Sequence, residues 1–286
     1  MLEKSTGKPR RGSKTKTRVR VVEDGKMRVR PDSLATEEPM EIRLISGGAK
    51  QTVAVTMRTP GADFELAAGF LYGEGIISSA EEILKISYCV DTDLGAEQQY
   101  NIVNVELRSG RDYDLRTLER HFYTTSACGV CGKASLEQLE IRGCSVIPPG
   151  PEVSADTIYT LPEKLRDSQG LFDATGGLHA AALFDADGSL VALREDVGRH
   201  NATDKLVGWA LLEGRLPLNG HVVMVSGRSS FEILQKCLMA GVPIVCAISA
   251  PSSLAVDVAR QFDMTLVGFL RNNRFNVYSA PGRIVV

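Results

Sequence analysis

The sequence lacks a continuous apolar run of 18 residues, and its first residues lack the apolar segment of a signal peptide. We therefore expect no membrane-spanning helix and a cytoplasmic protein. Aromatic residues make up only 6% of the 286 residues, whereas the apolar share of 43% and the charged share of 24% are those of soluble globular proteins. A chain of this length can bury the core of one large domain or of two modest ones.

Cysteine is also scarce, with six residues, and only Cys128 and Cys131 lie close together. In a reducing cytoplasm such cysteines are free thiols rather than a disulfide framework. Small residues surround the pair, and its glycines leave backbone room for a bulky partner. Lys133 and a helix-prone run over 134–140 would lower the pKa of a nearby thiol. We hypothesise that this segment handles sulfur chemistry, with Cys128 or Cys131 as the nucleophile.

Two other kinds of site use a C-x-x-C pair. A four-thiolate zinc site needs a second set of ligands, but Cys89, Cys144, Cys237 and Cys246 form no second close pair and are interpreted as small apolar residues. A thioredoxin-like redox pair normally follows a strand in a βαβ pattern. Here the pair follows a loop, in the half of the chain for which that pattern is not predicted. Both alternatives are less favoured than sulfur transfer.

Positive charge is concentrated at the start of the chain. Residues 1–20 carry eight Lys or Arg and one Glu, which is +7; since the whole chain is −2, the remaining 266 residues sum to −9. An acidic body argues against a nucleic-acid-binding protein. The basic tail, residues 1–20, has little apolar content, so we expect a disordered, solubilising terminus.

Residues 21–142 predict a small α+β domain that ends in the loop of Cys128 and Cys131. Apolar and polar residues alternate over 41–46 and 51–57 around a glycine-rich turn, as in a β-hairpin. Asp63 is expected to be the N-cap of the following helix. The further elements expected are helices over 64–71, 80–85 and near 115–120, and strands over 86–91 and 101–108.

Glycine and proline are concentrated in residues 143–155, which we interpret as a linker. Residues 156–286 predict an α/β domain with a hairpin of 178–184 and 190–195, followed by apolar strands that alternate with helices. This alternation is typical of a parallel sheet covered by helices. The strands are expected at 221–225, 243–248 and 264–270, and the helices at 156–169 (interrupted by Pro162), 201–212, 229–239 (with a capping box from Ser229 to Glu232) and 254–261.

Polar residues follow four of these strands where each one ends. The four exits are 194–201, 226–230, 249–253 and 271–274, and they are rich in Arg, Ser, Gly and Asn. Ligands of open α/β sheets bind at this carboxyl edge. Two of the exits lead into helix N-termini, which attract anions, and arginine adds charge-assisted bonds to phosphate. We therefore predict a phosphorylated ligand, such as a nucleotide, at this edge.

Three further polar side chains have two interpretations each. His179 follows a Thr-Gly-Gly turn, where a lone histidine is more often structural than catalytic. Asp196 and His200 lie four residues apart and are either an acid–base pair or part of a helix cap.

The chain resembles the FdhD family, the formate dehydrogenase accessory sulfurtransferases, over roughly residues 35–280. Six motifs in the same order carry the resemblance, and together they are far more specific than the C-x-x-C pair alone. They are Cys128–Gly132, Thr175–Ala181, Arg194–Ala202, Ser226–Ser230, Ser249–Ser252, and Phe269–Arg274 followed by Asn276–Tyr278.

The resemblance implies a sulfur carrier that takes persulfide sulfur from a cysteine desulfurase. It would pass the sulfur to the molybdenum cofactor, bis(molybdopterin guanine dinucleotide), which formate dehydrogenase requires. Cys128 would hold the persulfide, and Cys131 would assist or receive sulfur. The cofactor would contact the last strand exit, and with the other exits the expected cofactor-binding residues are Phe269, Leu270, Arg271, Asn272, Asn273, Arg274, Ser226, Gly227, Arg228 and His179.

The resemblance also implies a homodimer and a three-layer, cytidine-deaminase-like fold for the second half. Zinc deaminases carry H-x-E and P-C-x-x-C, but His179 is followed by Ala180 and Ala181 and the second motif is absent. Deamination is therefore not expected. A non-catalytic chaperone that only delivers the cofactor, and a zinc-stabilised binding module, stay as alternatives to the sulfurtransferase, and the need for Cys131 stays open.

Overall fold

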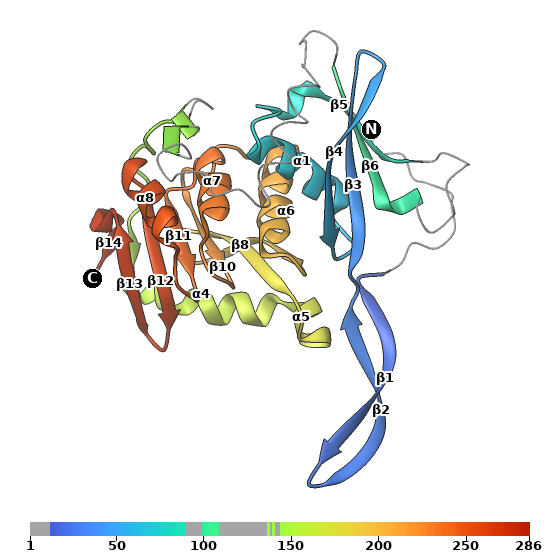
Figure 1. The fold of residues 1–286 in the computed structure, drawn as a ribbon. Coiled ribbons are helices and arrows are strands. Elements are labelled where there is room, and N and C mark those ends of the chain that lie inside the picture. Colours follow the sequence, from blue (N-terminus) through green and yellow to red (C-terminus); the bar gives the residue numbers. More distant parts are fainter. Residues whose placement is uncertain (1–11, 90–98, 109–135, 138, 141–143) are drawn as a thin grey trace.

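The computed structural model describes residues 12–89, 99–108, 136–137, 139–140 and 144–286 (Figure 1). The predicted helix near 115–120 and the pair Cys128 and Cys131 lie outside this part. The described chain forms a β-hairpin arm, a small four-stranded sheet with one helix, and a larger six-stranded sheet with helices on both faces. An α/β chain with an α+β first half and an α/β second half was predicted.

The arm consists of β1 (Lys14–Glu23) and β2 (Lys26–Ala35), which pair in antiparallel register. The prediction of disorder up to residue 20 was therefore wrong for residues 14–20. Lys and Arg alternate there with Thr and Val, and this period of two favours a strand once a partner strand is present. The composition of the tail alone could not reveal the partner strand, which lies in residues 26–35.

The small sheet has the order β4–β3–β6–β5, and the predicted hairpin is confirmed as β3 (Glu38–Ser46) and β4 (Ala49–Arg58). Gly47 and Gly48 connect them with φ of 56° and 80°, as a two-residue hairpin turn requires. The predicted strands are β5 (Ile83–Tyr88) and β6 (Ile102–Leu107), with a single turn, η2 (Gln99–Asn101), before β6. The predicted helix over 80–85 was wrong beyond η1 (Ala80–Glu82), because β5 pairs with β6 from Ile83.

Helix α1 (Asp63–Gly73) covers the small sheet, but Asp63 is not its N-cap. Ala62 occupies the cap position with φ of 54°, and no side chain caps the helix. Asp63 is instead fully buried, accepting a hydrogen bond from the Gly61 N–H and pairing with Arg58 at 3.2 Å. The carboxylate of Asp63 therefore pairs with Arg58 and does not cap the helix. The local sequence does not reveal that Arg58 is buried.

The large sheet has the order β13–β12–β11–β10–β8–β9. Its strands are β8 (His179–Asp185), β9 (Leu190–Asp196), β10 (His221–Val225), β11 (Ile244–Ala247), β12 (Thr265–Arg271) and β13 (Arg274–Ser279). Strands β10 to β12 are parallel as predicted, but β8 and β13 are antiparallel to their neighbours, so the sheet is mixed.

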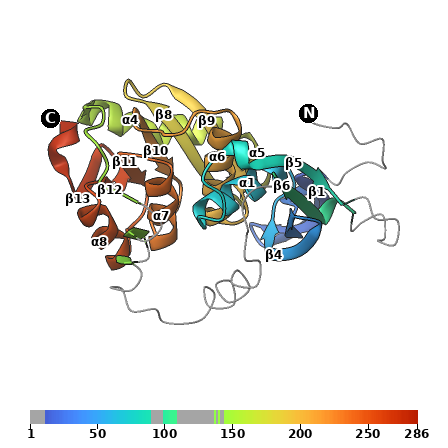
Figure 2. The same cartoon turned by 90° about the horizontal axis from the view of Figure 1, so that it is seen from above.

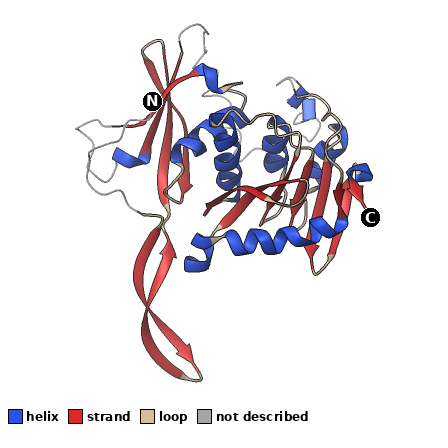
Figure 3. Cartoon of the chain, turned by 180° about the vertical axis from the view of Figure 1, so that it is seen from behind, coloured by secondary structure: helices blue, strands red, loops and turns tan. Residues whose placement is uncertain are grey.

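Helices cover both faces of this sheet and make three layers (Figures 1 and 3). One face packs against α6 (Arg199–Leu212), α7 (Phe231–Met239) and α8 (Ser253–Gln261), and the other against α4 (Ala155–Ser168). Helix α4 continues through Pro162, so the predicted interruption was wrong. A short helix, α5 (Gly170–Thr175), joins α4 to β8.

The described residues of the expected linker, 144–155, pack on the second half of the chain. The Ile147 N–H donates to the Phe262 carbonyl at 2.9 Å, and Ile147 is buried in the core. Residues Val153–Ser154 form β7, which pairs with β14 (Ile284–Val285), the strand after the turn η3 (Pro281–Arg283). This part of the segment is therefore a component of the larger unit rather than a free connection.

The two halves meet where α1 packs against α6 (Figure 2). Gly69 of α1 and Gly208 of α6 allow this contact, since a Cβ atom on Gly69 would lie 1.9 Å from the Asp204 carbonyl oxygen and one on Gly208 would lie 1.8 Å from the Glu65 carbonyl oxygen. The helix backbones therefore touch, which small residues alone permit. This contact holds the small sheet at a set distance from the larger one.

Candidate functional site

The four strand exits meet at one edge of the large sheet, which we call the strand-exit edge. Strand β9 is antiparallel to β8, and β8 is antiparallel to β10, so β9 runs in the same direction as β10, β11 and β12. All four strands end at that edge, and β8 begins there because His179 pairs with Asp196. The predicted convergence of the exits at this edge is confirmed. The strands β10, β11 and β12 are neighbours, about 4.8 Å apart, whereas β8 separates β9 from β10.

His179 lies beside the exit of β10. The Ser226 hydroxyl accepts a hydrogen bond from the Ala180 N–H, and the Ser226 N–H donates to the Ala180 carbonyl, each at 2.9 Å. A Cβ atom on Gly227 would lie 3.4 Å from His179 Nδ1, so the glycine leaves this ring room. Burial, together with the nearby Arg199, lowers the pKa of His179. The imidazole is therefore held in its neutral form next to a fixed cation.

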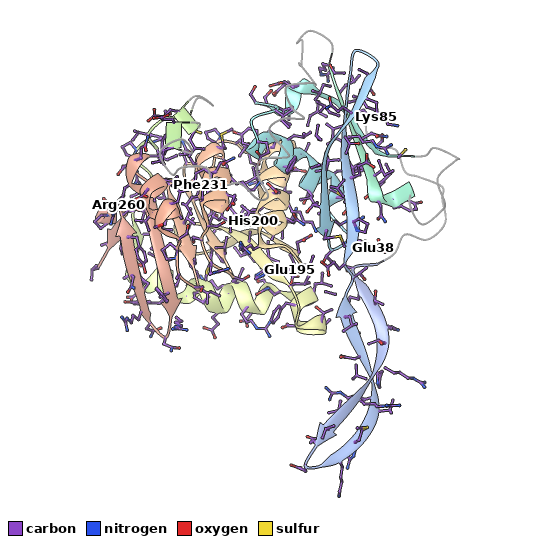
Figure 4. The ribbon with its side chains drawn as sticks, in the orientation of Figure 1. Glu38, Lys85, Glu195, His200, Phe231 and Arg260 are labelled. Carbon is purple, nitrogen blue, oxygen red and sulfur yellow. The ribbon has the colours of Figure 1, made fainter. Side chains whose placement is uncertain are left out.

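A second imidazole, that of His200, lies in the first turn of α6, close to the start of α7 (Figure 4). Its Nε2 lies 3.0 Å from the Ser230 hydroxyl and 3.6 Å from Glu232. Burial, with the Arg199 charge next, lowers the pKa of His200 to about 4 in spite of Glu232. At neutral pH the ring is thus a hydrogen-bonding group and not a cation.

Near the start of α7 lie polar groups that no atom of the described residues satisfies. The helix has Ser230 at its N-cap position without a capping side-chain bond, so the predicted capping box at Ser229 was wrong. The Ser229 hydroxyl is fully buried and has no hydrogen-bond partner in the described chain, and Arg199 Nε is likewise buried and unbonded. Unbonded donors next to a helix N-terminus suit an anion.

The exit of β11 lies directly beside that of β10. The Ser252 N–H donates to the Ser229 carbonyl at 2.9 Å, and Ser229 forms a bridge with Pro251. Ser252 caps α8 by accepting from the Ala255 N–H at 3.2 Å. The hydroxyl of Ser252 is therefore used within the protein, whereas that of Ser229 is not.

The last predicted binding segment, 269–274, is the end of a hairpin rather than an open loop. Asn272 and Asn273 form its turn with φ of 53° each, and the exposed residues Arg271 and Arg274 face each other across it. Phe269 is held at φ of 54° where the ladder to β13 is irregular. Leu270 is buried among residues that pack against α4, so its side chain cannot meet a ligand, unlike those of its exposed neighbours.

A buried polar network ties the exit of β9 to the first half of the chain. Asp196 pairs with Lys205 at 2.6 Å, and both side chains are almost completely buried. The other partners of Asp196 are the N–H groups of Thr59 and Gly198 and the side-chain amide of Asn201, at 2.8 to 3.1 Å. Asp196 therefore acts as a structural anchor, and the interpretation as an acid–base pair with His200 finds no direct contact.

The network sets the position of Arg199 and His200, which follow Asp196 in the chain. Asn201 donates to the Met57 carbonyl at 2.7 Å, and Lys205 donates to the Thr59 carbonyl at 2.9 Å. The sequence interpretation missed Lys205 and did not select Arg199. A lysine that directly precedes the apolar residues 206–212 of α6 was the one available signal for the buried pair.

The pair Cys128 and Cys131 lies outside the described residues, but both of its flanks are placed. Strand β6 ends at Leu107 in the small sheet, and Leu139 is buried in the core of the larger unit. Cys144, a little further on, has its Sγ 3.2 Å from Met239 Sδ at the carboxyl end of α7. The second flank is therefore at the sheet edge opposite to the strand-exit edge.

A cavity of about 380 Å³ lies at this opposite edge, lined by residues that include Tyr72, Cys144, Pro217 and Met239. Among the other cysteines, Cys89, Cys237 and Cys246 are buried, and burial raises the pKa of Cys237 and Cys246 to about 12. Their interpretation as small apolar residues is confirmed. In the part of the chain that the structure describes, no group of three or more His, Cys, Asp or Glu residues could hold a metal ion.

None of the helices in the described ranges is long and apolar enough to cross a membrane.

A family model described as the FdhD/NarQ family matches residues 35–285. The match begins at the last residue of the arm. Matches to curated proteins extend over most of the chain.

Three of these relatives carry the name "Sulfur carrier protein FdhD". The relative from Mycolicibacterium paratuberculosis is 50% identical over 94% of this chain and 98% of its own. Those from Streptomyces avermitilis and Sulfurisphaera tokodaii are 51% and 46% identical over 93% and 90% of this chain, and each is covered over 93% of its own length. A solved structure from Desulfotalea psychrophila, provisionally named a formate dehydrogenase accessory protein, is similar with a TM-score of 0.71 and 28% identity over 95% of this chain and 99% of its own.

Proposed function

Because the chain belongs to the FdhD/NarQ family, we propose that it is a sulfur carrier that serves the maturation of formate dehydrogenase. In this proposal Cys128 accepts sulfur from the persulfide of a cysteine desulfurase. The recipient is the molybdenum cofactor bis(molybdopterin guanine dinucleotide), held at the strand-exit edge as cargo. The observation that supports this most is the meeting of four polar strand exits, with unbonded donors at Ser229 and Arg199, at one sheet edge.

The cargo site is argued from charge and hydrogen bonding. The phosphates of a dinucleotide need N–H donors and cations, which the start of α7 and the residues Arg199, Arg228 and Arg271 offer. The exposed side chains of Arg228 and Arg271 extend this edge along the sheet. The neutral rings of His179 and His200 add hydrogen-bonding groups without further charge. The three-layer order with β8 antiparallel to its neighbours supports a cytidine-deaminase-like second half.

The sulfur chemistry follows from thiol exchange. The Cys128 thiolate attacks the outer sulfur of the donor persulfide, and the donor thiolate leaves. Attack of Cys131 on Cys128 Sγ then releases hydrosulfide and leaves a disulfide, which a dithiol reductant must reopen before the next cycle. Cys128 lies eight residues before Leu136, which packs against the core of the larger unit, so its thiol can lie at most about 29 Å from that point. A cargo at the strand-exit edge must come within this distance to receive sulfur from Cys128 of the same chain.

The first prediction concerns the carried sulfur. After incubation with a cysteine desulfurase and cysteine, the Cys128–Cys131 peptide should gain about 32 Da per sulfur atom, and a reductant should remove it. Cys128→Ser should abolish the gain, while Cys237→Ser, which changes a buried thiol, should not. A gain that survives Cys128→Ser would contradict the assignment of the carrier thiol.

The second prediction concerns the cargo edge. Guanosine diphosphate should raise the melting temperature, and Arg228→Ala combined with Arg271→Ala should abolish the rise because two exposed cations of this edge are lost. Arg260→Ala is the matched control, since this arginine lies in the last turn of α8, away from the strand-exit edge (Figure 4). An unchanged rise in the double variant would place the nucleotide elsewhere.

A non-catalytic chaperone for the same cofactor is the second candidate, because the strand-exit edge does not depend on the two cysteines. The double variant Cys128→Ser, Cys131→Ser separates the two functions. A pure carrier of the cofactor should still activate formate dehydrogenase, whereas a sulfurtransferase should fail.

A further inference from the structure

Three polar side chains meet where helices α6 and α7 begin, and we call them the exit cluster: His200, Ser230 and Glu232. His200 Nε2 lies 3.0 Å from the Ser230 hydroxyl oxygen and 3.6 Å from Glu232 Oε2. Figure 4 shows His200 beside the start of α7, which Phe231 marks. One nitrogen and two oxygen atoms from two helix starts are therefore close enough to bind a single ion.

All three groups of the exit cluster have a form that binds metal ions. At neutral pH the imidazole of His200 is neutral and the carboxylate of Glu232 is charged. The hydroxyl of Ser230 makes no capping bond to α7, so it can face the other two groups. The side chains of His200 and Glu232 are 36% and 54% exposed, which lets an ion from solution reach them.

The spacing of the donor atoms also fits a metal ion. Bonds of about 2.1 Å from a metal ion to its ligands place neighbouring ligand atoms roughly 3.0–3.4 Å apart. The two distances from His200 Nε2 are close to these values, so only small side-chain rotations are needed. The described residues contain no group of three or more His, Cys, Asp or Glu that could hold a metal ion. An ion at the exit cluster must therefore take further ligands from a bound molecule or from water.

The charge of Glu232 opposes the phosphate ligand of the proposed function. Glu232 lies in the first turn of α7, where a diphosphate would bind, and like charges repel. A cation between the carboxylate and the phosphates turns this repulsion into attraction. The positive charges of Arg199 and Lys236 act on His200 and so disfavour an ion that binds without phosphate. The ion and the phosphates are therefore expected to bind together.

We propose that the exit cluster binds a divalent cation of the Mn²⁺ type that also coordinates the diphosphate of a nucleotide at the strand-exit edge. Such an ion accepts carboxylate, hydroxyl and phosphate oxygens together with one imidazole nitrogen. The proposal rests on the nucleotide site of the proposed function and adds a metal ion to it. By linkage, the ion and the nucleotide strengthen the binding of each other by the same factor.

Calorimetric titration with guanosine diphosphate, once in a chelator and once in excess Mn²⁺, measures this coupling. For the wild type, Mn²⁺ should raise the affinity for the nucleotide at least about tenfold. Glu232→Gln should remove this gain, and in the chelator it should bind the nucleotide at least as tightly as the wild type, because the repelling charge is gone. The matched control is Asp185→Asn, since Asp185 is also 54% exposed and lies 3.4 Å from His221 at the opposite sheet edge. It should keep the gain.

Pulsed electron paramagnetic resonance identifies the ligands of the ion. In protein labelled with ¹⁵N-histidine, Mn²⁺ bound together with guanosine diphosphate should show coupling both to ³¹P and to a histidine ¹⁵N. His200→Leu should lose the nitrogen coupling, whereas His221→Leu should keep it. Thermal melts confirm that each variant is folded, as expected for side chains that are exposed or partly exposed.

The outcomes distinguish this proposal from the proposed function. Nucleotide binding that Mn²⁺ does not strengthen, or a gain that Glu232→Gln keeps, overturns the cation site and leaves the cargo edge standing. Coupling to ³¹P without coupling to a histidine nitrogen overturns it too, because the ion is then bound by the nucleotide alone. If guanosine diphosphate binds under neither condition, the nucleotide site and the cation site are both wrong.

Discussion

Lys205→Met should lower the free energy of unfolding by about 3–5 kcal/mol, the cost of leaving a buried carboxylate without its cation. Asp196 and Lys205 are 0% and 2% exposed, and their 2.6 Å contact is the centre of the network between β9, α6 and the end of β4. The three remaining donors to Asp196 do not neutralise its charge. Thermal and denaturant unfolding measure the loss.

The same variant should weaken nucleotide binding at the strand-exit edge, since Arg199 and His200 lie only three and four residues after Asp196. Restoring neutrality with Asp196→Asn in the Lys205→Met background should recover part of the stability, because the buried negative charge is removed. Arg166→Met is the matched control: Arg166 and Asp173 form an ion pair at the surface, with 53% and 54% of their side chains exposed. Its cost should stay within about 1 kcal/mol. If Lys205→Met and Arg166→Met lowered the free energy of unfolding by the same amount, the importance of the buried pair would be contradicted.

Gly208→Ala should be the second severe variant, because its new methyl group would lie 1.8 Å from the Glu65 carbonyl oxygen. The clashing atom belongs to the backbone, which cannot change rotamer as a side chain can. Helices α1 and α6 must therefore move apart, and this disrupts the buried interface between the two halves. We expect a loss of about 3 kcal/mol or more, which lowers the melting temperature by roughly 6–12 °C for a chain of this size.

Gly170→Ala tests whether the effect comes from the contact rather than from glycine itself. No atom lies within 4 Å of a Cβ atom built on Gly170, which begins α5 and has no left-handed φ. This control should be neutral or slightly stabilising. Gly69→Ala should match Gly208→Ala, because the two glycines meet across one contact. If Gly208→Ala melts like the wild type, the helices are not in backbone contact in solution.

Local sequence patterns determined most strands and helices of the second half. The hairpin of β8 and β9, the alternation from β10 to β12 and the helices between them depend on apolar periodicity, which acts over a few residues. The same reasoning placed polar side chains after β9, β10, β11 and β12, because exits follow from strand ends. Those exits converge as predicted, since all four strands share one direction.

The errors occurred where a distant partner outweighed a local preference. Residues 14–20 look disordered by composition, but they pair with residues 29–35. Asp63 has the sequence position of a helix cap, but the buried Arg58 takes its carboxylate. Ser229 fits a capping box, but α7 begins one residue later and the hydroxyl is left unbonded.

The sequence alone determined which chemical groups are present. These are a close pair of thiols, four polar strand exits, and a basic N-terminal segment before an acidic remainder of the chain. Motifs and periodicity encode these features because each depends on neighbours within a few residues. Only the tertiary structure decided that Leu270 faces the core, that Lys205 neutralises Asp196, and that two glycines bring α1 against α6. Such relations join residues far apart in the chain, and burial and charge become known only when the chain is folded.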